Sequence, residues 1–555
     1  MHDTTRHTAH PSAHGSGHHS DSGGPSGSSK PVVLGIAAVL LAYALAAIAG
    51  WPQYGRDLLE REQEAHHAAE SDHGAHGADG EHGDHGAHDE QEDHGDHAHA
   101  GAAPPLWAVI PFLILLTAIA VLPLTPPLAH WWEHNSSKFM VASALGLITL
   151  GYYTFLHREP IDLHFPAHAV VEGAPAGPSW ALPATVLANA LLAEYVPFIV
   201  LLFSLYCITG GVRIEGDLEA TPTVNASFIG IGALAASFIG TTGAAMLLIR
   251  PLLETNAQRR NVVHTVVFFI FLVCNCGGCL LPIGDPPLFL GYLQGVDFLW
   301  TMSLWKPWLV TNGILLAIYW LWDAAVAYPR ERSSDRSRDQ KAAGTLRITG
   351  LALNAPLMAG VILAVALLDP SKTLPGTAWH PWIYLREVVL IGLVGLSLWL
   401  GSDDVRRRNG FSYFAILEVA ALFVGIFVCM QPALAILNER GASLGIESAR
   451  AFFWITGALS SVLDNAPTYL VFFKTAQAME PVGAVMAGVD VARLAGISLG
   501  AVFLGAMTYI GNGPNFMVKA IAEQSGVRMP SFFGYMLYSL GVLAPVFLLV
   551  SFLFL

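Results

Sequence analysis

Long apolar segments separated by short polar connections make up most of the chain. They lie at 31–50, 105–125, 139–156, 181–209, 223–250, 261–300, 305–327, 348–368, 384–401, 411–437, 451–475, 493–523 and 531–555. Most approach or exceed the roughly 20 residues that a helix needs to cross a bilayer. The pattern predicts an all-α polytopic membrane protein.

Four of the later segments are interrupted by polar and helix-breaking residues. The interruptions are Gly240-Thr241-Thr242-Gly243, Gly284-Asp285-Pro286-Pro287, Ser460 to Thr468, and Gly511-Asn512-Gly513-Pro514-Asn515. Non-helical backbone at membrane depth is tolerated where it is buried in protein or lines a cavity. Because the interruptions occupy corresponding places in two halves, they are typical of a secondary transporter built from two repeats.

Lys and Arg in the short connections predict the orientation, since cytoplasmic loops carry more of them. The connections 328–347 and 402–410 are basic, so we expect both in the cytoplasm. The segment 223–250 has basic residues on both flanks (Arg213, Arg250, Arg259 and Arg260). Both of its ends are then cytoplasmic, so it must turn back as a re-entrant hairpin. Counting spans onward from this hairpin places residues 438–450 outside, so 451–475 becomes a second hairpin, which enters from the opposite face.

The spacing of acidic residues and breaks supports an internal repeat. Gly240 follows Glu194 by 46 residues, and Asp464 follows Glu418 by the same number. The two units start on opposite sides of the membrane, so they are inverted repeats. We expect their broken segments to meet near the midplane and to form the substrate site there.

The predicted organisation has seven parts. They are a disordered cytoplasmic tail (1–30), a transmembrane anchor (31–51), an extracytoplasmic loop (52–103), accessory helices (104–180), a first repeat (181–327) with its hairpin at 223–250 and broken helix at 261–300, the basic cytoplasmic loop (328–347), and a second repeat (348–555) with its hairpin at 451–475 and broken helix at 493–523. Ala47-Ile48-Ala49 also resembles a signal-peptidase site, so cleavage after the first segment stays open.

Composition agrees with a membrane protein, since 53% of the 555 residues are hydrophobic and 13% are charged. The net charge of −14 belongs almost wholly to residues 57–99, which hold fourteen Asp/Glu and one Arg. The membrane body is therefore nearly neutral, and nothing in it suggests nucleic-acid binding. The five cysteines lie in apolar segments, which argues against a disulfide framework.

The outer loop also holds ten histidines between 66 and 99, among them His73, His76, His82, His85 and His88. Clustered imidazoles and carboxylates can bind Zn, Ni or Cu weakly. A solvated polyelectrolyte linker whose charge changes near the His pKa explains the composition equally well. Both interpretations stay open. The thiols of Cys274, Cys276 and Cys279 lack a clear fourth ligand, so we expect them to pack in the core.

Asp464 is the first candidate for ion binding, because an intramembrane carboxylate must be paired, protonated or bound to a cation. Neighbouring side chains offer neutral oxygen ligands suited to a hard cation: Ser460, Ser461, Asn465 and Thr468. Asp464 could instead only cap the following helix. Lys474, further along the same hairpin, is expected to snorkel to the membrane surface.

Asp285 is a candidate second carboxylate for cation or proton, although Asp before Pro is also ordinary turn chemistry. Neutral ligands are expected from the other breaks: Thr241, Thr242, Asn512 and Asn515. Asn275 is a weaker candidate for lining the broken helix. Glu194 and Glu418 lie in matched places, where they could relay protons or sit at the membrane interface.

The breaks carry a family resemblance. The sequences Ser-Ser-Val-Leu-Asp464-Asn465-Ala-Pro467-Thr, Gly-Thr-Thr-Gly-Ala and Gly-Gly-Cys-Leu-Leu-Pro-Ile-Gly284-Asp285-Pro-Pro resemble the ion transporter superfamily. Within it, residues 181–555 are similar to NhaD-type sodium/proton antiporters and to citrate-transporter-like proteins. The resemblance implies hairpins and unwound helices around a central ion site, elevator-like alternating access, cation binding near Asp464 and Asp285, and a homodimer.

One departure bears on the substrate. Dicarboxylate carriers of the superfamily have Ser-Asn-Thr motifs at both hairpin tips, whereas here the first tip is Gly-Thr-Thr-Gly and the second carries Asp464. The departure disfavours a di- or tricarboxylate substrate.

The sequence thus predicts an exchanger of sodium, or lithium, for protons in the inner (plasma) membrane. Its partners would be the lipid bilayer and small ions, with no resident cofactor. The alternatives are a cation-coupled transporter of an anion such as citrate, and a His-rich metal-binding membrane protein. No nucleophile–base pair or zinc-protease helix motif predicts an enzyme.

Overall fold

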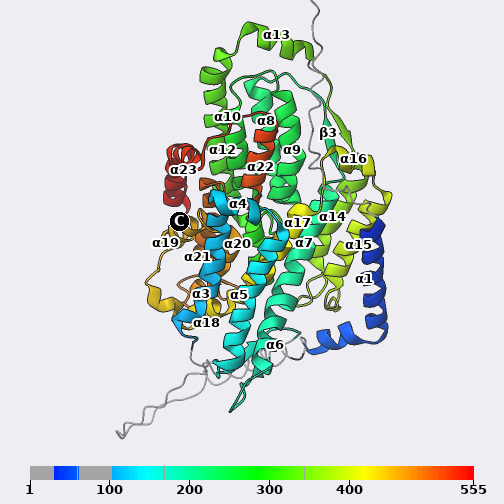
Figure 1. The fold of residues 1–555 in the computed structure, drawn as a ribbon, viewed down its shortest axis with the longest axis vertical. Helices are drawn as coiled ribbons and strands as arrows, with labels where there is room; N and C mark the ends of the chain where they lie inside the picture. The colour runs from blue at the N-terminus through cyan, green and yellow to red at the C-terminus, as the bar shows by residue number, and fades with distance from the viewer. Residues whose placement is uncertain (1–29, 59–60, 62–102, 167–168, 343) are drawn as a thin grey trace, which may run out of the picture.

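The computed structural model describes residues 30–58, 61, 103–166, 169–342 and 344–555. Most helices run along the long axis of the molecule, side by side (Figure 1). Among the described residues, six helices are long and apolar enough to cross a membrane, or up to eight if each of two bent pairs counts as one span. The predicted all-α polytopic class is confirmed.

The first hairpin consists of α8 (Pro222–Ile239) and α9 (Thr241–Thr255), which pack on each other and are separated by Gly240. Gly240 has φ +78°, a left-handed conformation that suits a glycine at a helix end. The turn is therefore a single residue, tighter than the predicted Gly-Thr-Thr-Gly break.

Both ends of this hairpin lie at the same end of the molecule. Before α8, β3 (Arg213–Glu215) pairs with β4 (Arg347–Thr349). After α9, Arg259 Nη1 donates to Asp323 Oδ2 (2.9 Å) and to Ala220 O (3.2 Å). These contacts hold the two flanks of the hairpin together, as the predicted re-entrant arrangement requires.

The second hairpin is α19 (Ala449–Ser460) and α20 (Asn465–Gln477). Arg493 joins the start of α19 to the end of α20, because it donates from Nε to Glu447 O (3.1 Å) and from Nη1 to Glu480 O (2.8 Å). The two flanks of this hairpin are thus also joined to each other.

Each hairpin is followed by a broken helix. The first comprises α10 (Val263–Leu272), η4 (Cys276–Cys279) and α11 (Pro286–Leu293), and the second α21 (Val491–Leu504), η9 (Gly505–Met507) and α22 (Gly513–Gln524). Pro stands in the first helical turn of α11 and of α22, where its missing N–H leaves no bond unmade. The first broken helix ends at Leu293, earlier than the predicted 300.

The remaining helices surround these elements. They are α1 (Lys30–Ile48), η1 (Leu106–Val109), α3 (Ile110–Val121), η2 (Leu122–Leu124), α4 (Pro126–Trp132), α5 (Asn135–Phe155), α6 (Ala181–Leu187), η3 (Ala188–Tyr195), α7 (Val196–Thr209), η5 (Trp300–Leu304), α12 (Trp305–Trp322), η6 (Asp323–Ala327), η7 (Tyr328–Arg330), α13 (Ser333–Ala342), α14 (Leu351–Leu367), α15 (Leu385–Leu400), α16 (Asp403–Arg408), α17 (Phe414–Cys429), α18 (Gln431–Arg440), η8 (Gly441–Leu444) and α23 (Phe532–Phe554). Two further ribbons pair β1 (Ile161–Leu163) with β2 (Ala169–Val171) and β5 (Val485–Met486) with β6 (Val489–Asp490).

Some of these elements differ from the expected spans. The predicted run 411–437 is divided into α17 and α18, which meet at an angle of 44°. η3 and η6 are π-helices that continue α6 and α12. π-helical turns are often found at functional sites, and η3 contains Glu194.

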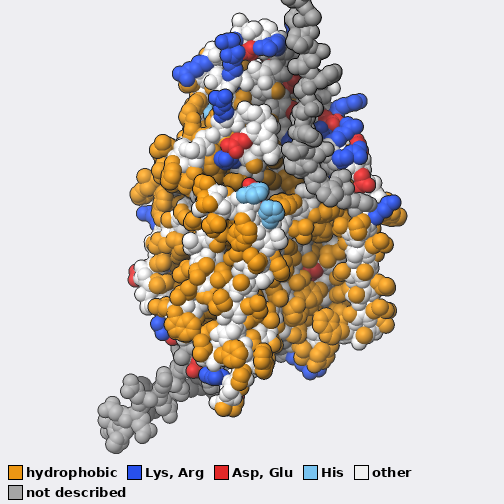
Figure 2. All heavy atoms as spheres, viewed as in Figure 1, with side chains coloured by type: hydrophobic (Ala, Val, Ile, Leu, Met, Phe, Trp, Pro, Cys, Tyr) orange, Lys and Arg blue, Asp and Glu red, His pale blue; other side chains and the backbone are white. Residues whose placement is uncertain are grey.

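The surface has the polarity of a membrane protein. Figure 2 shows apolar side chains over most of the visible face, and Lys and Arg gathered at the end where α13 and α16 lie. The two predicted cytoplasmic connections, 328–347 and 402–410, therefore lie towards the same end.

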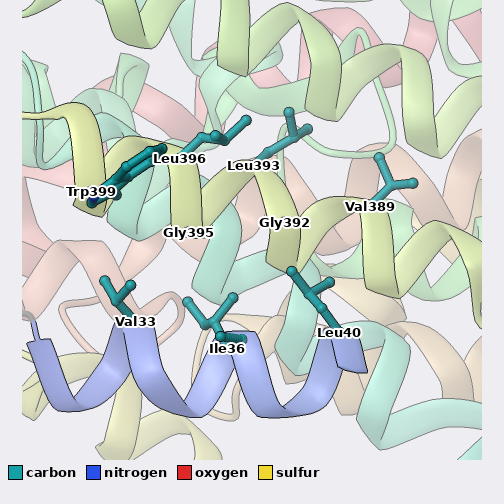
Figure 3. A pocket seen from close by; sticks show the side chains of 10 residues that line it. Val33, Ile36, Leu40, Val389, Gly392, Leu393, Gly395, Leu396 and Trp399 are labelled. Atoms are coloured by element: carbon teal, nitrogen blue, oxygen red, sulfur yellow. The ribbon is translucent and has the colours of Figure 1, made fainter. Parts of the chain in front are cut away.

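α1 packs on α15 at the edge of the molecule. Gly392 and Gly395 let the helices approach, and Ile36 Cγ2 lies 3.1 Å from where a Cβ of Gly395 would be. Between them runs an apolar groove of about 460 Å³ (Figure 3), lined by Val33, Ile36, Ala37, Leu40, Val389, Gly392, Leu393, Gly395, Leu396 and Trp399. Its wholly apolar lining suits a surface that faces lipid.

Candidate ion-binding site

Asp285 lies where both hairpins and both broken helices meet, and it is only 1% exposed. Thr241 Oγ1 donates to its Oδ1 (2.8 Å), and Asn465 Nδ2 donates to its Oδ2 (2.7 Å). Asn512 Nδ2 also donates to Oδ1 (3.0 Å). One carboxylate therefore connects the two repeats.

All four of these residues stand at helix N-termini. Asp285 and Asn512 are the N-cap residues of α11 and α22, and Thr241 and Asn465 are the first residues of α9 and α20. Each helix N-terminus carries roughly half a positive charge from its unpaired N–H groups. Four partial positive charges therefore point towards Asp285, while every side chain that donates to it is neutral.

Asn275 lies beside this carboxylate, in the break of the first broken helix. Its Nδ2 donates to Ile270 O (2.8 Å) and to Asn515 Oδ1 (2.8 Å). The amide orientation follows from the carbonyl partner, which can only accept. Asn275 Oδ1 is left buried without a donor among the described residues, and so is Asn465 Oδ1.

Gly505 separates these two amides. A Cβ at Gly505 would lie 3.1 Å from Asn275 Oδ1, 3.3 Å from Gly511 O and 3.7 Å from Asn465 Nδ2. Two oxygens that hard cations prefer, an amide and a backbone carbonyl, thus face the spot that only a glycine leaves open.

Asp464 has a different place from Asp285. Its side chain accepts from Ala466 N (3.1 Å), which makes it the N-cap of α20, and it is half-buried. It directly precedes Asn465, whose Nδ2 donates to Asp285 Oδ2 (2.7 Å). Asp464 therefore caps its helix, and its connection to Asp285 is through the neighbouring Asn465.

Several predicted ligands do not face Asp285. Ser460 Oγ donates to Ala501 O (2.7 Å), and Ser461 Oγ to Ala458 O (2.7 Å). Thr468 Oγ1 donates to Asp464 O (2.9 Å). These hydroxyls bond to backbone carbonyls. Thr242 is half-buried and takes no part in the hydrogen bonds around Asp285.

Asn515 supports the site indirectly, through its bond with Asn275. Its Nδ2 donates to Gly505 O (2.9 Å) and Thr508 O (3.0 Å), while its Oδ1 accepts from Asn275. It therefore holds the amide of Asn275 in place. In the sequence Asn275 is a weaker candidate, and the signal that points to it is an amide within an apolar segment that breaks at two glycines.

The two predicted proton-relay acids have different surroundings. Glu194 Oε1 accepts from Gln294 Nε2 (3.4 Å). Glu418 forms an ion pair with Lys138 (2.6 Å), whose side chain is 5% exposed. Lys138 was not among the sequence candidates because it lies one residue before the apolar segment 139–156.

The sequence predicts weak metal binding only in the outer loop, whose histidines lie outside the described residues: His73, His76, His82, His85 and His88. Cys274, Cys276 and Cys279 are buried and free. In the part of the chain that the structure describes, no three His, Cys, Asp or Glu side chains are grouped as a metal site would require.

Helical hairpins and broken helices whose N-termini meet at a buried carboxylate define a membrane transporter. The chain belongs to the family CitMHS_2, described as "Putative citrate transport", whose model matches residues 101–555. No curated protein matches the chain.

Proposed function

We propose that the protein exchanges sodium, or lithium, for protons across the inner (plasma) membrane. The observation that carries the proposal is the buried carboxylate of Asp285, whose partners are neutral donors. An ionised carboxylate taken out of water without a counter-ion costs several kcal/mol. Asp285 is therefore suited to hold a proton and a cation in turn, and a group that holds them alternately performs antiport.

The surroundings of Asp285 suit both forms. Thr241, Asn465 and Asn512 donate to the carboxylate and stabilise its charge when the proton has left. The unpaired oxygens of Asn275 and Asn465 would then complete a shell around a hard cation. Asp464 would be the second acid, close enough that a proton on one carboxylate favours ionisation of the other.

The antiport test uses everted membrane vesicles that carry a proton gradient. Addition of Na⁺ or Li⁺ should dissipate the gradient in vesicles containing the protein, as followed by recovery of acridine-dye fluorescence. Vesicles without the protein are the control. If neither ion restores fluorescence above this control between pH 6 and 9, the proposal fails.

The second candidate is cation-coupled transport of a carboxylate anion such as citrate. Two observations favour it: the family description, and the four helix N-termini, which suit an anionic group. Against it stands Asp285, whose own carboxylate occupies the point on which they converge. Uptake of labelled citrate driven by a Na⁺ gradient in proteoliposomes, with sulfate and arsenite as comparisons, distinguishes the two candidates.

A further inference from the structure

Glu194 is a second acid inside the helical body, half-buried and separate from the site around Asp285. It lies in the π-helix η3, between α6 and α7. Its Oε1 accepts from Gln294 Nε2 (3.4 Å), and its Oε2 is buried with no donor among the described residues. Half of this carboxyl group thus has no partner, which is unstable for an anion in apolar surroundings.

Lys474 carries a positive charge that would compensate the negative charge of an ionised Glu194. α11 and α20 both begin at the ion site and pack on each other. Gln294 follows Asp285 by nine residues on α11, and Lys474 follows Asn465 by nine on α20. At 1.5 Å per residue both lie about 13 Å from the site. Gln294 and Lys474 are therefore at the same level, where Gln294 bonds Glu194. The ends of the two helices meet at Ala487, which accepts from Gln477 Nε2 and lies 3.7 Å from where a Cβ of Gly295 would be.

In this structure Lys474 Nζ donates to Gln477 Oε1 (2.9 Å) on its own helix. Gln477 is in turn fixed by a bond from its Nε2 to Ala487 O (3.2 Å). Lys474 therefore has an acceptor on its own helix, and the unpartnered Oε2 of Glu194 is a second acceptor at the same level of the molecule.

We propose that Glu194 and Lys474 form a second proton-binding site, in which Lys474 is the internal cation that replaces the proton. When Glu194 is protonated, Lys474 bonds Gln477, as observed. When Glu194 loses its proton, Lys474 turns to it and compensates the charge. Glu194 belongs to the helix that precedes the first hairpin and Lys474 to the second hairpin, so deprotonation ties the two together.

Gln294, which donates to Glu194, lies at the end of α11, and Lys474 lies on α20. Because Gln294 is neutral, only Lys474 changes the charge balance. The consequence is that α20 is held when Glu194 is ionised and released when it is protonated. Under the proposed antiport, the rate of cation exchange would change with the protonation of Glu194. The proton site itself does not depend on antiport.

Glu418 offers a matched control. It occupies the corresponding place in the second repeat, but its Lys138 partner lies on α5, outside both hairpins, and the ion pair is already formed. Loss of the Glu418 charge should leave the mobility of α20 unaffected by pH.

The test is hydrogen–deuterium exchange of residues 465–477 in the purified protein in nanodiscs, corrected for intrinsic exchange. As pH rises from 5 to 9, exchange should slow about tenfold in the wild type, since Lys474 replaces a bond within α20 by one to another helix, which opposes local opening. Glu194→Gln and Lys474→Met should remove this dependence, and Glu418→Gln should keep it. A dependence that survives in both Glu194→Gln and Lys474→Met, or is missing in the wild type, overturns the proposal.

A charge swap guards against variants that merely disturb packing. Glu194→Lys should lose the pH-dependent protection, and the double variant Glu194→Lys/Lys474→Glu should regain it, because the pair is rebuilt in reverse. Failure of the double variant to regain protection contradicts the pairing. Hydrogen–deuterium exchange is measured without transport, so a negative antiport assay would not affect this result. The two proposals can therefore fail separately.

Discussion

At the scale of single residues, Asp285 and Asp464 have different chemical surroundings although both precede helices in apolar breaks. Asp285 accepts three side-chain hydrogen bonds from both repeats, whereas Asp464 accepts from Ala466 N on its own helix. The first carboxylate depends on distant residues, the second on its neighbours. Their substitutions should therefore have different effects.

Two substitutions of Asp464 separate its capping from its charge. Asn caps a helix about as well as Asp, so Asp464→Asn should change the free energy of unfolding by less than about 0.5 kcal/mol. Asp464→Ala should cost about 1 kcal/mol through the lost cap. Both should slow cation exchange about tenfold or more if the charge takes part. Full exchange activity in Asp464→Asn would restrict Asp464 to capping.

Gly505 tests the oxygens beside Asp285. Gly505→Ala would place a methyl group 3.1 Å from Asn275 Oδ1 and 3.3 Å from Gly511 O. We expect the apparent KM for Na⁺ to rise about tenfold, because the space between the ligands is filled. Gly513→Ala is the control, since its Cβ would have no neighbour within 4 Å. Equal effects of the two substitutions would argue against a cation at this spot.

The residues at this site mark the limit of what sequence could predict. The breaks, their polar residues and the family were recognisable because helix breakers in apolar segments are local signals. The central role of Asp285 was not, since it depends on Thr241, Asn465 and Asn512 arriving from elements far apart in the chain. The partner of Glu418 was hidden for the same reason, because Lys138 belongs to an accessory helix.

At the scale of elements, each hairpin depends on the arginine that joins its flanks. Arg259 bonds Asp323 and Ala220 O at the first, and Arg493 bonds Glu447 O and Glu480 O at the second. Lys and Arg counts predicted the first hairpin, since a segment with two cytoplasmic flanks cannot cross, and counting spans onward from it predicted the second. These counts could not predict which arginine joins the two flanks of each hairpin, because that depends on three-dimensional geometry.

Arg493→Gln tests the second of these contacts. The substitution removes two hydrogen bonds from a buried guanidinium, each worth about 1.5–3 kcal/mol for a charged donor. The melting temperature in detergent should fall by several degrees. Arg450→Gln is the control, because Arg450 is exposed and makes one such bond, to Ser551 O. Equal losses in the two variants would contradict a special role for Arg493.

At the scale of the whole molecule, the account requires that the end carrying α13 and α16 faces the cytoplasm. Basic side chains gather there (Figure 2), and the positive-inside rule assigns that end accordingly. The inverted repeats then open their hairpins towards opposite sides, which suits alternating access around one central carboxylate.

Thiol labelling of intact cells tests this orientation. The five native cysteines are buried, so background labelling should be low. An impermeant maleimide should label Thr373→Cys in intact cells and Ser334→Cys only in everted vesicles; both positions are exposed. The reverse result would invert the orientation.

Deletion of the His-rich residues 62–99 tests the interpretation of the protein as a His-rich metal-binding membrane protein. Because the ion site is built from residues beyond 240, antiport should persist at close to the wild-type rate. Binding of Zn²⁺ or Ni²⁺ to the purified protein should fall if the imidazoles hold metal. Loss of antiport with the loop would make the loop a working part of the transporter.

Proton release on cation binding addresses the central claim, that one carboxylate holds a proton and a cation in turn. It can be measured by titrating purified protein with Na⁺ in two buffers of different ionisation enthalpy. The account predicts that Na⁺ binding displaces about one proton per chain, and that Asp285→Asn neither binds Na⁺ nor releases a proton. Na⁺ binding without proton release, or undiminished release in Asp285→Asn, would contradict it.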